Sequence, residues 1–337
     1  MSETIIENAE KAILFSSLSG YNFYTLDPKK KPSGFYCGKH CISGEEVEIR
    51  FSDQPRWING WRNIIEYPAD SEFYLWPVDV VSYYDGTNQK QGLVFQRQSF
   101  PAKSFPQLEP LKKFLYTDEL LDWRTEPVKR FLYHFLDCAI HLNNGGYAYF
   151  DYNLDRIYYN PQDMNVLFDF TPYITRLDGD RYRNEKIPGA DVAIEFLAPW
   201  VPAEGTVQVD LICEYYAIAA ILFRAMIGRM PYQGRQMDGH GNIMNLLTDT
   251  DAMLHRQMFL VYRSNPRFIF EPGQHENTIG QFDNEKKYKE RWKALPEQIQ
   301  TMMMQVLCMK NAKADNLDRV VYSPQEWMEA FSRYIFV

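Results

Sequence analysis

Two aspartates in similar sequence surroundings are the residues of this chain best suited to chemistry. Asp151 follows the apolar run 147–150, and Asp169, 18 residues later, follows the apolar run 166–168. Two carboxylates that each follow a short apolar run, with a polar turn between them, can converge on one cleft. One carboxylate can then accept a proton while the other binds a divalent cation. Aspartates also cap strands in ordinary turns, so the spacing alone leaves a structural role open.

The elements that must position these acids change in character near residue 100. Before that point, alternating or β-branched runs predict strands at residues 46–51, 74–81 and 92–95. The Ser- and Pro-rich segment 96–110 then predicts a hinge. Beyond it, apolar residues at helical spacing predict helices over residues 128–142, 210–228, 296–307 and from Ser323 onward. A β-rich first third and a helical remainder predict an α+β, two-lobed arrangement.

Several helix boundaries carry specific signals. Thr125 with Pro127 starts the first long helix, and Gly228 ends the second. The second helix is apolar nearly all the way round, which predicts burial on all sides. Ser323 and Glu326 form a capping box at the start of the last helix.

Composition narrows the class of protein further. The 337 residues carry a net charge of −8, with 45% hydrophobic residues, which indicates a large core and disfavours a nucleic-acid or anionic-membrane surface. No uninterrupted apolar run reaches the roughly 18 residues of a membrane helix. The five cysteines form no CxxC pair, and the first residues lack the pattern of a signal peptide, so we expect a cytoplasmic location.

Motifs in a fixed order resemble those of the eukaryotic-like protein kinase superfamily. The windows at Asp151 and Asp169 resemble its catalytic loop and metal-binding motif. Residues 196–199 resemble its Ala-Pro-Glu segment, residues 214–232 its buried central helix, and Arg319 its late arginine. The resemblance extends over roughly residues 35 to 335.

The resemblance implies a fold and a domain organisation. It implies a bilobal protein-kinase-like fold, with an N-terminal extension over residues 1–20, a small β-rich N-lobe over 21–98 and a larger helical C-lobe over 99–337. Residues 265–272 are also similar to an insert in bacterial kinase-like proteins linked to von Willebrand A domain partners.

The resemblance also assigns roles to individual residues. It makes Asp151 the candidate base and Asp169 the ligand of one Mg²⁺, and it pairs Arg50 with Glu66. A retained ATP would lie near the hinge, and its candidate contacts are Arg50, Glu66, Arg156, Phe95, Gln96 and Gln98.

The departures from the family pattern bear most on function. Arg50 stands where an active kinase has lysine, and Arg156 stands where it has the asparagine that binds a second metal. Gly34 and Gly38 are separated by bulky residues, which prevents a backbone from approaching phosphate closely. Trp200 replaces the acid of the Ala-Pro-Glu segment.

These departures favour a pseudokinase, with weak or no phosphotransfer, that acts by partner binding or regulation. ATP with one Mg²⁺ is the candidate cofactor, and the absence of any cofactor is left open. The expected partner is a protein rather than nucleic acid or membrane. One alternative is an active atypical Ser/Thr kinase or nucleotidyl transferase that uses Asp151 and Asp169. Another is an interaction module whose cleft is filled by Phe35, Tyr36 and other aromatic residues.

Overall fold

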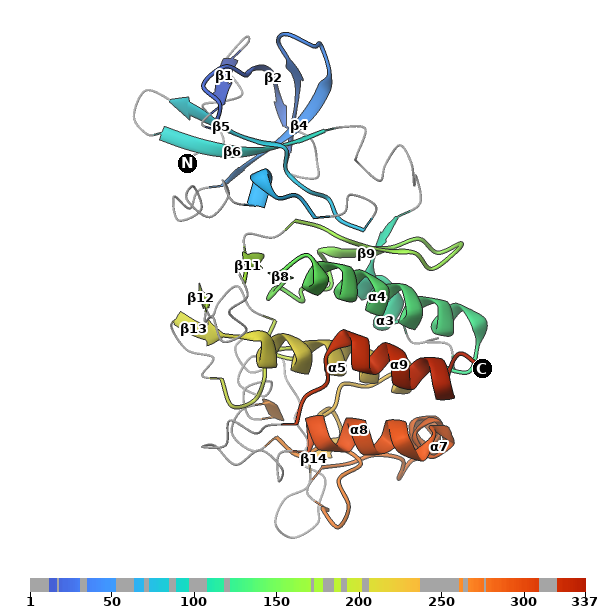
Figure 1. The fold of residues 1–337 in the computed structure, drawn as a ribbon. Coiled ribbons are helices and arrows are strands. Elements are labelled where there is room, and N and C mark those ends of the chain that lie inside the picture. Colours follow the sequence, from blue (N-terminus) through green and yellow to red (C-terminus); the bar gives the residue numbers. More distant parts are fainter. Residues whose placement is uncertain are drawn as a thin grey trace. The chain divides into compact units, whose positions relative to one another are not determined.

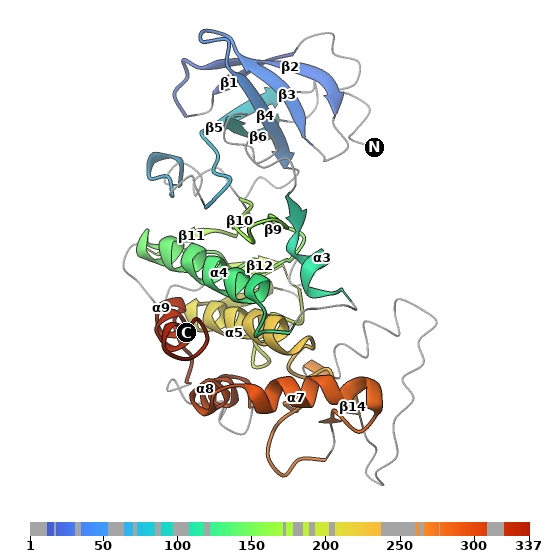
Figure 2. The same ribbon diagram turned by 90° about the vertical axis from the view of Figure 1, so that its right-hand side faces the viewer.

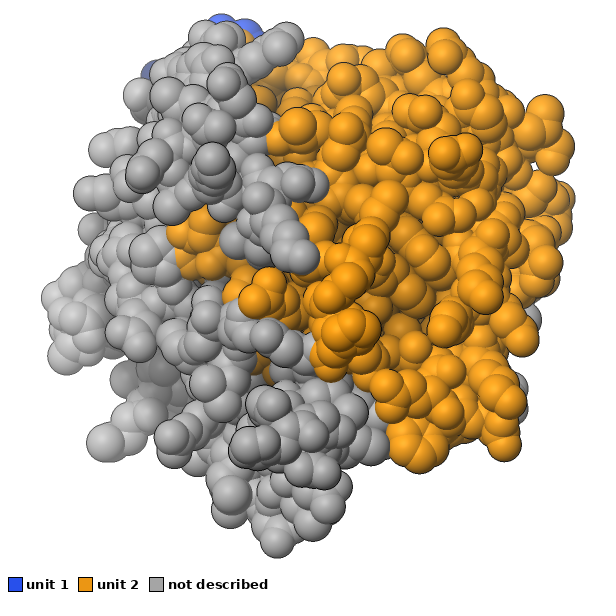
Figure 3. All heavy atoms as spheres, turned by 90° about the horizontal axis from the view of Figure 1, so that it is seen from below, with its two compact units in different colours: residues 1–108, 167–172 blue, residues 109–166, 173–337 orange. Residues whose placement is uncertain are grey.

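The computed structural model divides the chain into two compact units, which Figure 3 shows in different colours. The first unit contains residues 1–108 and 167–172, and the second contains residues 109–166 and 173–337. The structure describes residues 12–16, 18–30, 35–52, 64–69, 73–84, 89–96, 108–117, 122–170, 173–177, 185–188, 193–201, 206–236, 261–262, 266–275, 277–308 and 320–337.

The first unit is built around a closed barrel of six antiparallel strands (Figure 2). Around the barrel the strands follow the order β1-β2-β3-β4-β6-β5, and β1 pairs with β5 to complete the circle. The strand bounds are β1 Ala12–Ser16, β2 Phe23–Lys30, β3 Tyr36–His40, β4 Glu46–Ser52, β5 Asp79–Tyr84 and β6 Gln89–Gln96.

Alternation along the strands fills the barrel. On β1, Leu14 is fully buried, whereas its neighbours Ile13 and Phe15 are more than half exposed. A strand directs successive side chains to opposite faces, so one face of each strand supplies the interior. The buried cluster inside the barrel consists of Leu14, Tyr24, Leu26, Tyr36, Val47, Ile49, Val81 and Val94.

A buried carboxylate stabilises the closure between β1 and β5. Asp79, at the start of β5, accepts hydrogen bonds from Ser16 Oγ at 2.8 Å and from Tyr24 Oη at 2.8 Å. Asn22 Nδ2 donates to it at 3.2 Å and the Val80 N–H at 2.8 Å. Burial and the neighbouring Asp79 raise the pKa of Tyr24 far above its usual value, so this hydroxyl remains a donor. The network joins β1, β2 and β5 at one point.

The predicted bilobal protein-kinase-like fold is wrong. Its small β-rich N-lobe is replaced by a closed six-stranded barrel, because β1 provides an edge to which β5 pairs. Closure leaves no sheet edge unpaired around the circle, unlike an open sheet. The fold is a barrel-containing α+β fold.

The second unit is mainly helical (Figure 1). Helix α5 contacts α4, α7 and α8, and α9 contacts both α4 and α8. The helix bounds are α3 Leu111–Leu115, α4 Glu126–Asn144, α5 Leu211–Ile227, the 3-10 helix η6 Asp283–Glu285, α7 Lys286–Ala294, α8 Glu297–Leu307 and α9 Pro324–Tyr334. The short strands outside the barrel are β7 Glu109–Pro110, β8 Tyr147–Ala148, β9 Ile157–Tyr159, β10 Val166–Phe168, β11 Thr175–Arg176, β12 Glu185–Pro188, β13 Thr206–Val209, β14 Arg235–Gln236 and β15 Asn277–Thr278. Of these, β10 ends in the first unit, which contains residues 167–172.

The predicted long helices are confirmed, and α5 forms the centre of the second unit. Asp210 caps α5 by accepting from the Cys213 N–H, and Gly228 ends it with a φ of 90°. Nearly every residue of the helix is buried, as its apolar character predicts. The capping box of Ser323 and Glu326 is present at the start of α9. Across the described residues, no helix combines the length and apolarity needed to cross a membrane.

Candidate functional site

In the first unit, three of the predicted site residues lie together. Arg50 on β4 donates from Nη1 to both oxygens of Asp169, at 2.7 Å and 2.8 Å. The Arg50 guanidinium also lies over the Phe95 ring, 4.7 Å from its centroid. The side chain of Asp169 is 9% exposed and that of Arg50 is 28% exposed. The pair is therefore largely shielded from solvent, where charge-assisted hydrogen bonds are strongest.

Backbone pairing brings Asp169 into the first unit. Phe168 forms a parallel bridge with Tyr74, in which the Leu75 N–H donates to the Phe168 carbonyl at 3.0 Å. Phe170, on the other side of Asp169, makes edge contacts with Trp76 and Phe95. These contacts place the carboxylate beside the end of β4, 119 residues away in the sequence.

The remaining predicted residues of the first unit take no part in this cluster. Glu66 is solvent-exposed, and Arg50 pairs with Asp169 instead. Gln96 is exposed at the end of β6, and Gln98 lies outside the described residues. Gly38 lies within β3, where an added Cβ would be 2.5 Å from the Thr25 carbonyl oxygen. It therefore allows two strands to pack closely and forms no loop.

In the second unit, Asp151 pairs with Arg156. The distance from Arg156 Nη1 to Asp151 Oδ2 is 3.5 Å. The Asp151 side chain is 4% exposed, whereas that of Arg156 is 41% exposed. Asp151 also accepts a weak hydrogen bond from the Asn153 N–H at 3.3 Å. Both carboxylates predicted for catalysis thus contact an arginine, each within its own unit.

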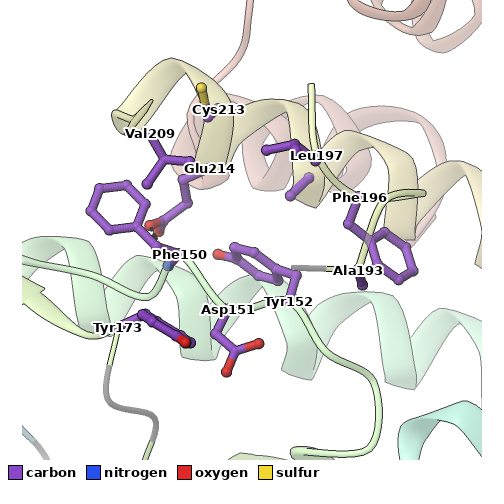
Figure 4. A pocket seen from close by; sticks show the side chains of 11 residues that line it. Phe150, Asp151, Tyr152, Tyr173, Ala193, Phe196, Leu197, Val209, Cys213 and Glu214 are labelled. Atoms are coloured by element: carbon purple, nitrogen blue, oxygen red, sulfur yellow. Dashed lines mark hydrogen bonds between the residues drawn. The ribbon is translucent and has the colours of Figure 1, made fainter. Parts of the chain in front are cut away.

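The turn that carries Asp151, residues 147–152, is bonded to a second buried acid, Glu214 on α5 (Figure 4). Glu214 Oε2 accepts from the Tyr149 N–H at 2.7 Å and from the Phe150 N–H at 3.4 Å. Glu214 Oε1 accepts from Asn143 Nδ2 at 3.1 Å. Phe150 has a φ of 53°, a left-handed conformation that is uncommon outside glycine and costs about 1–3 kcal/mol. The bonds to Glu214 hold this strained backbone in place.

Glu214 is buried without a cationic partner among the described residues, which is uncommon for an acidic side chain. The residue is 1% exposed, and within the described residues no lysine, arginine or histidine contacts it. Burial raises the pKa of Glu214 to about 7, although the hydrogen bonds from Asn143, from the Tyr149 and Phe150 backbone and from the Tyr152 hydroxyl act in the opposite direction. The carboxyl therefore changes charge near neutral pH.

Asp151 and Glu214 both line a small cavity. Its volume is about 20 Å³, enough for about one water molecule. Figure 4 shows the Asp151 carboxylate pointing away from Glu214. The cavity is lined mainly by aromatic and aliphatic side chains, among them Phe150, Tyr152, Tyr173, Phe196 and Leu197.

Three other residues that the sequence analysis singled out either make contacts elsewhere or lie outside the described residues. Trp200 packs edge-on against Tyr216 on α5, with ring centroids 5.4 Å apart. Arg319 and Gly34 lie outside the described residues. Across the ranges described above, no cluster of three or more His, Cys, Asp or Glu side chains is arranged to bind a metal ion.

Sequence reasoning gave no individual role to Glu214 or Asn143. One signal was available for Glu214: it is an acid at the start of a helix that is otherwise apolar all round, and a fully buried glutamate needs hydrogen-bond partners. Asn143 carries no comparable signal, because an asparagine near a helix end is common.

A scan against protein-family models found no match to the chain, and a search of curated proteins found none either.

Proposed function

We propose that this protein transfers phosphate weakly or not at all and acts by binding and regulating a protein partner. This is the pseudokinase role that the degenerate motifs imply. The observation that carries the proposal is the contact between Arg50 and Asp169, the predicted metal ligand. Its two oxygens already accept hydrogen bonds from one guanidinium, at 2.7 Å and 2.8 Å. Mg²⁺ would compete with Arg50 for these oxygens, and the positive charge of the guanidinium opposes the binding of a second cation beside it.

The surroundings of Asp151 support the same proposal. Arg156 competes with any substrate hydroxyl for the lone pairs of this carboxylate. Loss of one preorganised charge-stabilising donor lowers a rate by roughly 10²–10³, and the chain lacks the lysine, the glycine loop and the asparagine of an active kinase.

We propose a cytoplasmic location together with this function. The described cysteines are all free thiols, two of them at or near the surface, which is typical of a reducing compartment such as the cytoplasm. Binding of ATP with one Mg²⁺ is a separate prediction. Without metal, the candidate contact in the first unit is Arg50, whose side chain is 28% exposed, because the Phe95 side chain is buried.

The test is phosphate transfer from ATP in the presence of Mg²⁺. We expect the wild type to match the Asp151→Asn and Asp169→Asn variants, since neither carboxylate is used in catalysis. Activity in the wild type that both variants lose would establish the active atypical kinase or nucleotidyl transferase instead. Folding of each variant is checked by its thermal melt.

A further inference from the structure

Four polar side chains on the barrel of the first unit form a chain of hydrogen bonds that ends at an exposed serine. Ser43, in the turn between β3 and β4, lies with its Oγ 2.8 Å from Nδ1 of His40. The other ring nitrogen of His40, Nε2, lies 3.4 Å from Asn22 Oδ1. Asn22 Nδ2 in turn donates to the buried carboxylate of Asp79 at 3.2 Å. A hydroxyl, an imidazole and an acceptor at the far ring nitrogen form the arrangement that activates a serine as a nucleophile.

We propose that Ser43 is an acyl-accepting nucleophile, with His40 as its general base and Asn22 as the residue that positions the imidazole. The site goes beyond the function proposed above and uses none of the residues assigned there. The acyl donor it would take is an activated ester of a short aliphatic acid. Ser43 is exposed, so a donor reaches the hydroxyl directly from solvent, and the neighbouring Ile42, 76% exposed, offers apolar surface beside it.

The hydrogen bonds assign the proton on the imidazole. The Ser43 N–H donates to His40 Nδ1 at 3.2 Å, so Nδ1 carries a lone pair and the neutral ring has its proton on Nε2. Nε2–H is then the donor to Asn22 Oδ1, and the Ser43 hydroxyl is the donor to Nδ1. The orientation of the Asn22 amide agrees, because its Nδ2 is needed as the donor to Asp79. His40 can therefore accept the proton of Ser43 at Nδ1 without first changing tautomer.

The turn between β3 and β4 holds the nucleophile and the base together. The His40 carbonyl accepts from the Gly44 N–H at 2.9 Å, and the His40 N–H donates to the Glu45 carbonyl at 2.9 Å. Gly44 has a φ of 73°, a left-handed conformation that glycine adopts without strain. The His40 ring also packs against Tyr24, with ring centroids 5.2 Å apart. Both groups are therefore positioned before any substrate binds.

The transfer step uses only the hydroxyl, the imidazole and the ester. Ser43 Oγ attacks the carbonyl carbon of the ester, and its proton passes to His40 Nδ1 as the bond between Oγ and carbon forms. The bond from that carbon to the leaving oxygen then breaks, and the leaving oxygen takes the electron pair. The proton on Nδ1 goes to the leaving oxygen or to solvent, which restores the neutral ring and leaves Ser43 acylated.

Reaction of the intact protein with p-nitrophenyl acetate tests the proposal, because this compound is an activated ester of a short acyl group. Samples are quenched with acid, and peptide mapping gives the rate of acetylation at each residue. Ser19 is the matched reference: it is also an exposed turn serine that accepts backbone N–H groups, but within the described residues no imidazole contacts it. General-base catalysis contributes about 10²–10⁴, so we expect Ser43 to react at least about a hundredfold faster than Ser19.

Two variants separate catalysis from a merely structural role of the ring. In His40→Asn the amide can still accept from the Ser43 N–H but is not a base, so Ser43 should react as slowly as Ser19. Asn22→Ala should also slow the acetylation of Ser43. Lys39, an exposed neighbour of His40, reacts through its own amine, so its acetylation should be unchanged in both variants. A loss of barrel stability alone would not slow Ser43 relative to Lys39.

Two results would overturn the proposal. One is acetylation of Ser43 in the wild type that is no faster than that of Ser19, which includes acetylation confined to Lys39 and the exposed thiol of Cys41. The other is an unchanged rate at Ser43 in His40→Asn. The first comparison needs no variant, so it decides the question even if His40→Asn does not fold. An unchanged rate in Asn22→Ala would overturn the positioning role of Asn22.

Discussion

Removal of the Asp79 carboxylate should open the barrel between β1 and β5. Among the described residues, the register between these strands contains two pairs, Phe15 with Ser82 and Ser16 with Val81. We call this short junction between β1 and β5 the seam. Asp79 stabilises it by accepting hydrogen bonds from Ser16 on β1 and from Tyr24 on the neighbouring strand β2. The variant Asp79→Ala removes the carboxylate, so the buried hydroxyls of Ser16 and Tyr24 lose their hydrogen-bond acceptor.

The magnitude follows from the bonds that are lost. A hydrogen bond to a charged group contributes about 1.5–3 kcal/mol, and two buried hydroxyls donate to Asp79 at 2.8 Å. Allowing for non-additivity, we expect the seam to lose about 3 kcal/mol, or roughly a hundredfold in its opening equilibrium. Tyr24→Phe removes one of these two donors and should cost about 1.5 kcal/mol.

Hydrogen exchange of the β1 amides is the direct assay. In Asp79→Ala these amides should exchange about a hundredfold faster than in the wild type, whereas the amides of α5 in the second unit should be unchanged. Asp27→Ala is the matched control, since Asp27 is an exposed aspartate on β2 of the same barrel. The reasoning is refuted if β1 stays protected within about threefold of the wild type.

Two further predictions concern packing and pH. Gly38→Ala should destabilise the first unit by about 2 kcal/mol or more, because the new Cβ would lie 2.5 Å from the Thr25 carbonyl oxygen and 3.3 Å from Ile49 Cδ1. Urea unfolding measures the change in the free energy of unfolding. A Gly38→Ala variant as stable as the wild type would contradict the close packing of these strands. The free energy of unfolding should carry a pH-dependent contribution from Glu214, since its pKa is raised from 4.5 to about 7 on folding. That contribution is complete below pH 4.5, decreases by about 3 kcal/mol as the pH rises to 7, and is constant above 7. The difference between wild type and Glu214→Gln across this range isolates it, and a difference that does not vary with pH would contradict the raised pKa.

The helices of the second unit could be predicted from the sequence because their signals are local. The capping box of Ser323 and Glu326, the N-cap at Asp210 and the left-handed Gly228 each act within a few residues. The apolar stripe of α8 likewise coincides with its buried residues. Such patterns predict a helix without knowledge of its tertiary contacts.

The barrel could not be predicted, because its closure depends on distant residues. Strand β1 is only five residues long, and its partner β5 begins 63 residues after Ser16. Neither segment signals that the other completes a circle. The predicted strand over residues 74–81 is only partly correct, since β5 begins at Asp79 and the preceding residues are irregular.

At the candidate site, the sequence likewise indicated individual residues but not their contacts with residues far along the chain. The sequence identified Asp151, Asp169, Arg50 and Arg156 as chemically important residues, but it paired Arg50 with Glu66. The observed partner, Asp169, is 119 residues from Arg50 and approaches it through the backbone bridge at Phe168. The contact between Glu214 and the 147–152 turn also joins residues about 65 positions apart.

The most direct test of the proposed function is a single-turnover experiment with the protein in excess over labelled ATP and with Mg²⁺ present. This arrangement detects transfer to the protein itself as well as hydrolysis, without knowledge of any acceptor. We predict that the label is consumed no faster by the wild type than by Asp169→Asn, because Arg50 pairs with both oxygens of that carboxylate and opposes the binding of Mg²⁺ there. Consumption that requires Asp169 would contradict the account.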